Sequence, residues 1–280
     1  MIRSLLYVPA SSPRFIEKAH LRGADAIIID LEDALAPNMK AQARANLGET
    51  VASVGQNGAT VFVRVNNDPA LLDEDCIAAC RAGAFGLYIP KVSDPALLAR
   101  IDALLRPVEE TLQRPALRFV PLIEDAAGVL RAAEIAASPR VYALSCGSED
   151  LATSMGGVPT PEVLYLPKLL VHLAAKAAGV QSFGLLRTVA DYKDVDGYKA
   201  SIAEARNFGF DGASCIHPSV VALLNEGFAP SAQDIERARR LVAAAEEHAA
   251  RGIGAFEFEG QFVDAPIVAR AKALIARGQP

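Results

Sequence analysis

Residues 26–33 of the chain read Ala-Ile-Ile-Ile-Asp-Leu-Glu-Asp, an apolar run that ends abruptly in acidic side chains. A run in which apolar and polar residues do not alternate is typical of a strand buried on both faces, as in parallel sheets. The acids at its end lie where such a strand would leave the sheet. The pattern therefore predicts a buried parallel strand that ends at these acids.

The same pattern recurs along the chain at intervals of about 30 residues, the size of one βα unit. The predicted strands are Leu5–Val8, Ala26–Leu31, Thr60–Val65, Gly86–Ile89, Arg118–Ile123, Val141–Cys146, Gln181–Leu185 and Gly212–Ile216. Amphipathic stretches between them predict helices, among them Pro13–Leu21, Ala96–Leu105, Ala126–Ala137 and Tyr198–Asn207.

Eight such units favour a (β/α)8 TIM barrel, with residues 1–228 as the catalytic domain. The alternative is an open, doubly wound sheet. That fold usually carries a glycine-rich phosphate loop after its first strand, where this chain has Pro9-Ala10-Ser11-Ser12-Pro13.

Residues 229–280 form a predicted C-terminal helical extension. Ser231 has the position of an N-cap, and the following helix would run to His248. A short hairpin and a last helix after Asp264 would complete the extension. It is either a lid or arm that reaches a neighbouring subunit, or a helix packed on the barrel wall. We expect Phe256, Phe258 and Phe262 to form an exposed apolar stripe on it.

Composition excludes several classes of protein. The 280 residues carry 28 basic and 33 acidic side chains, a formal charge of −5, which gives no basic footprint for nucleic acid. With 51% hydrophobic residues the chain can bury a large core, and we find no run long enough for a membrane span. The apolar run before Pro9 is short, so we expect it not to be a signal peptide. Its four cysteines lack disulfide or zinc spacing, which predicts reduced thiols in a cytoplasmic protein.

Polar side chains collect where the predicted strands end, at the face on which barrel enzymes carry their active sites. Glu124 and Asp150 follow the fifth and sixth strands and would face the same mouth. Carboxylate oxygens with water suit Mg²⁺. The alternative is that the acids only form ion pairs with Arg64 and Lys91.

Several motifs occur in an order that resembles a known family, the citrate lyase beta-subunit-like proteins, which include malyl-CoA and citramalyl-CoA lyases, within the HpcH/HpaI aldolase group. The motifs are Arg3-Ser4, Tyr7-Val8-Pro9, Asp30–Ala34, Val63–Asn66, Ile89–Lys91, Ile123-Glu124, Gly147–Leu151, Ile216–Pro218 and Gly260–Asp264.

The resemblance implies a barrel that assembles as trimers or larger rings, with Mg²⁺ held by Glu124 and Asp150. Arg64 would contact the substrate carboxylate and the thioester oxygen, and Asp33 would hold metal-bound water. Asp264 would reach the active site of a neighbouring subunit. The remaining implied contacts are with coenzyme A and come from Tyr7 and Lys18.

Three positions depart from the family pattern. Ala213 stands where the family commonly has lysine, Val220 where it has glutamine, and Ser12 where the CoA lyases often have arginine. We expect these changes to lie near the side that meets the acyl carrier.

The resemblance favours a Mg²⁺-dependent lyase that cleaves or forms a small 3-hydroxyacyl-CoA, such as malyl-CoA or citramalyl-CoA, through an enolate. Mg²⁺ would stabilise the alkoxide and Arg64 the enolate oxygen. Asp264 would supply the proton. The alternative is a plain N-cap before Ala265-Pro266, and the resemblance favours the catalytic role. Lys91 offers a Schiff-base mechanism, but we prefer its pairing with the acids. His217 is a general base or, as we prefer, a turn residue that meets the ligand.

Three other functions stay open at this point. One is the beta subunit of a larger citrate lyase that acts on a thioester of an acyl carrier protein. Another is a metal-dependent keto-acid aldolase that needs no CoA. The last is a barrel that binds a ligand without catalysis. We expect the protein to act on a small molecule, with no nucleic acid or membrane partner. We also expect it to be a homo-oligomer, a trimer or hexamer.

Overall fold

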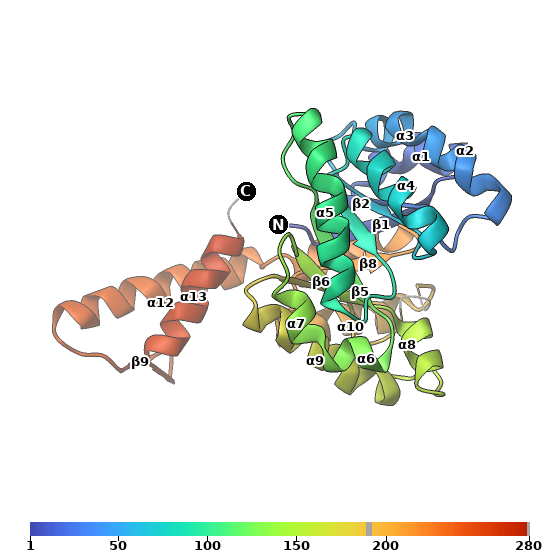
Figure 1. Ribbon diagram of the computed structural model, residues 1–280. Helices are drawn as coiled ribbons and strands as arrows, with labels where there is room; N and C mark the ends of the chain where they lie inside the picture. The colour runs from blue at the N-terminus through green and yellow to red at the C-terminus, as the bar shows by residue number, and fades with distance from the viewer. Residues whose placement is uncertain (189–191, 279–280) are drawn as a thin grey trace. The chain divides into compact units, whose positions relative to one another are not determined.

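The computed structural model (Figure 1) describes residues 1–188 and 192–278. In them eight parallel strands form one sheet in the order β7-β6-β5-β4-β3-β2-β1-β8. The outer strands β7 and β8 meet through backbone hydrogen bonds. The amide N of Gly184 donates to the carbonyl O of Gly212 at 2.9 Å, and Asp211 N donates to Ser182 O at 3.0 Å. The sheet therefore closes into the predicted (β/α)8 barrel.

Every predicted strand overlaps an observed one. The observed strands are β1 Ser4–Pro9, β2 Ala26–Asp30, β3 Thr60–Arg64, β4 Gly86–Ile89, β5 Arg118–Ile123, β6 Ala143–Cys146, β7 Gln181–Phe183 and β8 Ala213–Cys215. The two strands that close the ring are shorter than predicted. Leu185, after β7, is buried without belonging to the hydrogen-bonded ladder, whereas Ile216, after β8, is 48% exposed.

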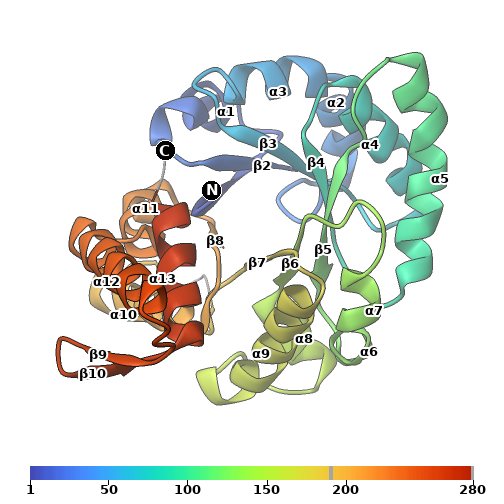
Figure 2. The same cartoon turned by 90° about the vertical axis from the view of Figure 1, so that its left-hand side faces the viewer.

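Helices lie on the outside of the strand ring, as Figure 2 shows for α3, α4, α5 and α9. They are α1 Pro13–Ala19, α2 Lys40–Ala45, α3 Leu47–Val54, α4 Pro69–Arg81, α5 Pro95–Thr111, α6 Ala126–Leu130, α7 Ala132–Ala136, α8 Ser148–Ser154, α9 Pro161–Ala177, α10 Val195–Phe208 and α11 Val221–Phe228, with 3-10 turns at His20–Arg22, Pro37–Met39 and Pro218–Val220.

Aspartate is the N-cap of two of the longer helices, α4 and α5. Asp68 accepts the amide of Ala70 and Asp94 that of Ala96, and each is followed by proline in the first turn. The single helix predicted over Ala126–Ala137 is wrong. The chain leaves helical geometry at Arg131, with φ −105° and ψ 9°, so α6 and α7 are separate.

The barrel interior is filled by side chains from several strands, not by solvent. Phe62 and Tyr88 pack edge to face, with ring centroids 5.5 Å apart, in one cluster with Leu5, Ile28 and Phe183. The alternate residues of β2, Ile27 and Ile29, are equally buried on its other face. Burial of both faces explains why this strand shows no apolar–polar alternation.

The chain divides into two compact units, Ile2–Asn225 and Glu226–Pro280 together with Met1. In the second unit, α12 Ala232–Ala250 and α13 Ala265–Arg277 lie side by side, joined by the hairpin β9 Phe256–Phe258 and β10 Gln261–Val263 (Figure 1). The predicted N-cap is confirmed, because Ser231 Oγ accepts the amide of Asp234 at 3.0 Å.

The predicted phenylalanine stripe of this unit is wrong. Phe256 and Phe258 pack against the small core of Ala238, Leu241, Val263 and Ala271, and only Phe262 is well exposed, at 67%. The hairpin register explains the difference. Phe256 pairs with Val263 on the core face, whereas Phe262 pairs with Glu257 on the opposite face.

Among the described residues, none of the helices combines the length and the apolar character that crossing a bilayer takes. All four cysteines are free thiols. Three of them, Cys76, Cys80 and Cys215, are buried, and Cys146 is partly exposed.

At Gly212, where the barrel closes, the structure leaves no room for a side chain. A Cβ on Gly212 would lie 2.4 Å from the carbonyl O of Ile2 and 2.7 Å from that of Arg3, so β1 and β8 would have to separate. We expect Gly212→Ala to lower the free energy of unfolding by about 1–3 kcal/mol, measured by urea denaturation. The control is Gly184→Ala at the same junction, whose Cβ meets nothing closer than Phe210 at 3.6 Å. Equal urea midpoints for the two variants would contradict this explanation.

Candidate active site

Arg64, the last residue of β3, is held by three carboxylates. Its Nε and Nη2 bind Asp30 Oδ1 and Oδ2 at 2.8 and 2.6 Å, a two-pronged contact. Its Nη1 lies 2.9 Å from Glu32 Oε2 and 3.2 Å from Asp33 Oδ2. The Arg64 side chain is only 12% exposed, so its position is fixed by charge-assisted hydrogen bonds.

The sheet register explains how these groups meet. Asp30 and Arg64 are direct neighbours across the β2–β3 ladder. The Asp30 carboxylate also accepts the amides of Glu32 at 2.9 Å and Ala34 at 3.2 Å. One buried acid thus fixes both the arginine and the loop that carries Glu32 and Asp33. Sequence reasoning missed this role, because it rests on cross-strand pairing.

Tyr7 lies beside the arginine, with the guanidinium carbon 5.0 Å from its ring centroid. Its ring also meets Tyr88 edge to face. Burial raises the pKa of the Tyr7 hydroxyl, which keeps it protonated. Tyr7 therefore belongs to the wall of the barrel mouth, next to Arg64.

Glu124 directly follows β5 and is 6% exposed. Its Oε2 accepts the amide of Lys91 at 2.8 Å. Lys91 adopts a left-handed φ of 55°, a sparsely populated conformation for a residue with a side chain. Glu124 Oε1 fills the space where a Cβ of Gly147 would stand, 2.6 Å away. An unusual backbone conformation and an absent side chain thus position this carboxylate.

Asp150 lies in the first turn of α8, which follows β6. It lines one cavity of about 470 Å³ together with Glu124, Arg64, Asp33 and Tyr7. The neighbouring Glu149 lines it too and accepts a hydrogen bond from Thr188 Oγ1 at 3.0 Å. The structure therefore brings the predicted carboxylates of the fifth and sixth strands to one mouth.

Negative charge exceeds positive charge in this cavity. Burial, together with Glu32 and Asp150, raises the pKa of Glu124 to about 7, against the opposing effects of the Lys91 amide and Arg64. Burial and Asp33 raise the pKa of Glu32 to about 7 as well, although Arg64 opposes this. Lys91 Nζ is 3.8 Å from Glu32 Oε1, which agrees with the expected pairing but leaves the acids in excess. A bound cation would relieve this repulsion.

The donor set suits a hard cation. Glu124 and Asp150 offer carboxylate oxygens only, and Mg²⁺ commonly binds one or two protein carboxylates with water or substrate oxygens. Within residues 1–188 and 192–278, no group of three or more His, Cys, Asp or Glu side chains is placed to hold a metal. A metal here would therefore depend on these two acids and on non-protein oxygens.

Lys18, His217 and Asp264 are not among the described residues that line the cavity. Lys18 is exposed on α1. His217 caps the 3-10 turn Pro218–Val220, with Nδ1 accepting the amide of Ser219 at 3.2 Å, and stacks on Tyr192. Asp264 occupies the N-cap position of α13, yet its side chain makes no capping hydrogen bond.

The expected placement of one family departure is not supported. Ala213 is fully buried at the amino end of β8, where it pairs with Ser4 of β1. Because parallel strands begin at the same end of a barrel, this position is opposite the mouth. Val220 is buried, and Ser12 stands before α1, after the carboxyl end of β1.

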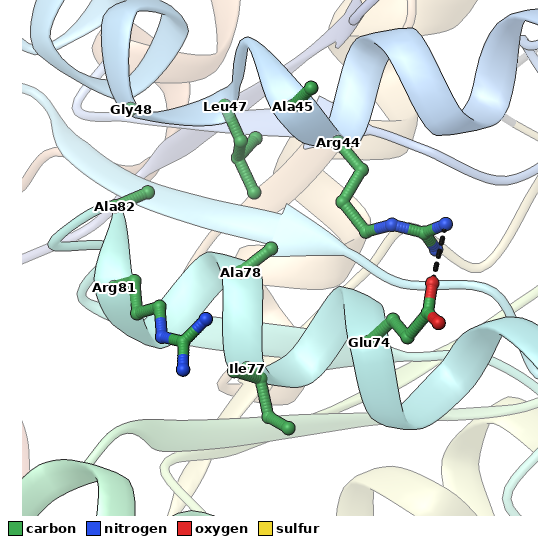
Figure 3. Close-up of a pocket in the computed structure, with 9 residues that line it drawn as sticks. All are labelled: Arg44, Ala45, Leu47, Gly48, Glu74, Ile77, Ala78, Arg81 and Ala82. Atoms are coloured by element: carbon green, nitrogen blue, oxygen red, sulfur yellow. Dashed lines mark ion pairs between the residues drawn. The ribbon is translucent and has the colours of Figure 1, made fainter.

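A second hollow, of about 520 Å³, lies among α2, α3 and α4 (Figure 3). Apolar side chains such as Leu47 and Ile77 line much of it. Arg44 is held there by Glu74 at 2.7 Å and by Asp75 at 2.9 Å. Two arginines, Arg44 and Arg81, line this hollow with a single acid, Glu74, so it lacks the excess of carboxylates found in the strand-end cavity. We therefore take the strand-end cavity as the candidate site.

The chain is similar to known proteins of one family. Residues 3–218 match the family model described as HpcH/HpaI aldolase/citrate lyase. The chain is 37% identical over 285 residues to a (3S)-malyl-CoA thioesterase of Cereibacter sphaeroides, covering 99% of this chain and 94% of that protein. It is 32% identical over 280 residues to the citrate lyase subunit beta of Leuconostoc mesenteroides subsp. cremoris, covering 98% and 92%.

A solved structure shows the same architecture. The crystal structure of CitE from Mycobacterium tuberculosis, in complex with magnesium, acetoacetate and coenzyme A, aligns with a TM-score of 0.79 and 29% identity. The alignment covers 98% of this chain and 97% of that chain.

The contact between Gly147 and Glu124 yields a prediction for metal binding. In Gly147→Ala the new Cβ would displace the Glu124 carboxylate, so we expect Mg²⁺ affinity, measured by calorimetry, to fall about 10-fold or more. The matched control is Gly157→Ala, whose Cβ meets nothing closer than Val163 at 3.4 Å. Unchanged affinity in a folded Gly147→Ala protein would show that Glu124 does not contribute to metal binding.

Proposed function

Because the chain belongs to the HpcH/HpaI aldolase/citrate lyase family, we propose that it is a Mg²⁺-dependent carbon–carbon lyase that cleaves or forms a small 3-hydroxyacyl-CoA. The observation that carries the proposal is the cavity in which Arg64 and an excess of carboxylates meet. The magnesium, keto acid and coenzyme A of the similar CitE structure support the cofactor and the substrate class. Malyl-CoA and citramalyl-CoA are the substrates to test first.

Cleavage between C2 and C3 has three requirements. The hydroxyl on C3 loses its proton, the electron pair of the broken bond moves into the acyl thioester, and C2 then takes up a proton. Bound Mg²⁺, held by Glu124 and Asp150, would stabilise the negative charge on the substrate oxygens. The remaining steps depend on side chains of this chain.

Arg64 is the group that would stabilise the enolate oxygen and the substrate carboxylate. A guanidinium has five N–H groups, and the Arg64 contacts with Asp30, Glu32 and Asp33 use about four of them. The weakest partner is Asp33, at 3.2 Å and with a 59% exposed side chain. Asp33 would therefore yield its place to the substrate and turn towards metal-bound water.

Asp264 would supply the proton to C2, acting in the active site of a neighbouring subunit. Two observations support this. The Asp264 carboxylate is not used for capping. Among the described residues of the unit that carries it, four buried apolar side chains form the core, with half-buried ones packed against them, which is small for independent stability. We therefore propose that residues 229–280 reach a partner in a homotrimer or hexamer. We also propose that the enzyme acts in the cytoplasm, which its four free thiols favour.

Thioester hydrolysis is the second candidate, because one similar protein is a (3S)-malyl-CoA thioesterase. The two reactions differ in their products. A lyase releases a carbonyl acid and leaves the thioester intact, whereas a thioesterase releases a free thiol and leaves the carbon skeleton intact.

Product analysis with malyl-CoA, citramalyl-CoA and Mg²⁺ separates these functions. We expect a carbonyl acid together with an acyl-CoA, at equal rates, and no free thiol. Free thiol without a carbonyl product would assign the thioesterase reaction. Turnover of free 4-hydroxy-2-oxo acids, with none of the thioesters, would assign an aldolase. Turnover of a carrier-bound citryl thioester alone would assign the citrate lyase subunit.

The metal ligands give a further prediction. We expect Glu124→Gln and Asp150→Asn to abolish Mg²⁺-dependent turnover while circular dichroism shows folded protein, because each change removes a negatively charged ligand. The control is Glu149→Gln. Glu149 is a neighbouring acid that accepts a hydrogen bond from Thr188, and this variant should retain most of the activity. Full activity of wild-type protein in excess EDTA would contradict the metal requirement.

Subunit exchange tests the role of Asp264. Glu124→Gln and Asp264→Asn proteins, each inactive alone, should recover part of the activity after mixing, because a mixed ring can hold one intact composite site. Exchange is verified with differently tagged subunits. If exchange occurs and activity does not return, Asp264 acts within its own subunit or takes no part.

A further inference from the structure

Lys168 is a buried lysine in the middle of α9, with 4% of its surface exposed. Three oxygens surround its ammonium group, each at 2.8 Å from Nζ: Ser148 Oγ, Leu185 O and Arg187 O. All three are neutral. This differs from Arg64 and Arg44, whose charges are compensated by carboxylates.

Such a position is costly for an ammonium group. Burial lowers the pKa of Lys168 to about 8, which shows how strongly the site disfavours the charge. The three hydrogen bonds offset part of this cost, since an ammonium has three donors and meets three acceptors. An apolar side chain of similar length would avoid the cost, but it would leave the acceptors without these bonds.

The three oxygens belong to two different walls of the candidate site. Ser148 is the first residue of α8, and Asp150 follows it in the same turn. Leu185 and Arg187 belong to the segment after β7, and Thr188 comes next. Ser148, Asp150 and Thr188 all line the cavity. One ammonium group therefore joins the helix of the proposed metal ligand to the segment that follows the neighbouring strand β7.

A second link joins the same two walls. Thr188 Oγ1 donates to Glu149 Oε1 at 3.0 Å, at the surface of the cavity. This bond is exposed, whereas the bonds of Lys168 to Ser148 and Leu185 are buried. Buried hydrogen bonds are not in competition with water, so Lys168 is the stronger constraint on the distance between the walls.

We propose that Lys168 is a positioning residue, which fixes α8 and the segment Leu185–Thr188 relative to each other so that Asp150 is placed before metal binds. It touches neither metal nor substrate in this role. The inference rests on the proposed function in one respect, namely that Asp150 is a metal ligand.

The test compares Lys168→Met with Lys176→Met. Methionine has nearly the volume of lysine but donates no hydrogen bond. Lys176 lies two turns further along α9 and pairs with Asp211 outside the cavity, with 34% of its side chain exposed, so it is a matched control. Hydrogen exchange of the metal-free proteins, Mg²⁺ calorimetry and steady-state kinetics are measured for both variants.

We expect Lys168→Met to speed amide exchange about 10-fold in residues 148–151 and 184–188 and to weaken Mg²⁺ binding about 10- to 100-fold. Saturating Mg²⁺ should restore most of kcat, because the reacting groups themselves are unchanged. Lys176→Met should leave Mg²⁺ affinity and exchange in both segments as in the wild type. Unchanged Mg²⁺ affinity in folded Lys168→Met protein would overturn the proposal, even with faster exchange.

A second variant keeps the test decisive if Lys168→Met does not fold. Ser148→Ala removes only the link to α8 and leaves Lys168 its two carbonyl partners. It should speed exchange in residues 148–151 but not in 184–188, and it should weaken Mg²⁺ binding; unchanged Mg²⁺ affinity overturns the proposal. If the wild-type protein binds no Mg²⁺, the proposed function fails, while the exchange data still decide whether Lys168 joins the two segments.

Discussion

The bidentate pair between Asp30 and Arg64 is the interaction on which the rest of the site depends. It joins the ends of β2 and β3, and both groups are largely removed from water. Removing either partner would leave an uncompensated buried charge, which typically costs about 3–5 kcal/mol. The same Asp30 carboxylate holds the backbone of the following loop. The positions of Glu32 and Asp33 therefore follow from this one pair.

The pair also determines the electrostatics of the cavity. Asp30 balances the only charge of Arg64, so Glu32, Glu124 and Asp150 keep a negative excess that Lys91 relieves only in part. Two uncharged features hold Glu124 near the other acids, namely the backbone amide of Lys91 and the absent side chain of Gly147. The left-handed Lys91 aims its amide at Glu124, and Gly147 leaves room for the carboxylate. The fold thus holds acids together that would separate in a flexible chain, and this arrangement favours a cation.

The sequence predicted the barrel because its strands are buried on both faces, which leaves uninterrupted apolar runs such as Ile27–Ile29. It also predicted which polar side chains share a mouth, since these follow the strands directly. It did not reveal Gly147 or Lys168, whose roles depend on contacts between distant segments. The tail stripe was predicted wrongly, because the register of a short hairpin decides which phenylalanines face its core.

The departures from the family pattern can be weighed by the same physical criteria. A side chain can select a substrate only where it meets the ligand or moves a residue that does. Ala213 is fully buried at the amino end of β8, and Val220 is the buried residue of the turn that His217 caps. Ser12, by contrast, is partly exposed at the N-cap position of α1, on the side of the barrel where the strands end. Of the three changes, only the one at Ser12 is therefore placed where a side chain could meet a ligand at the mouth, and the other two bear on packing.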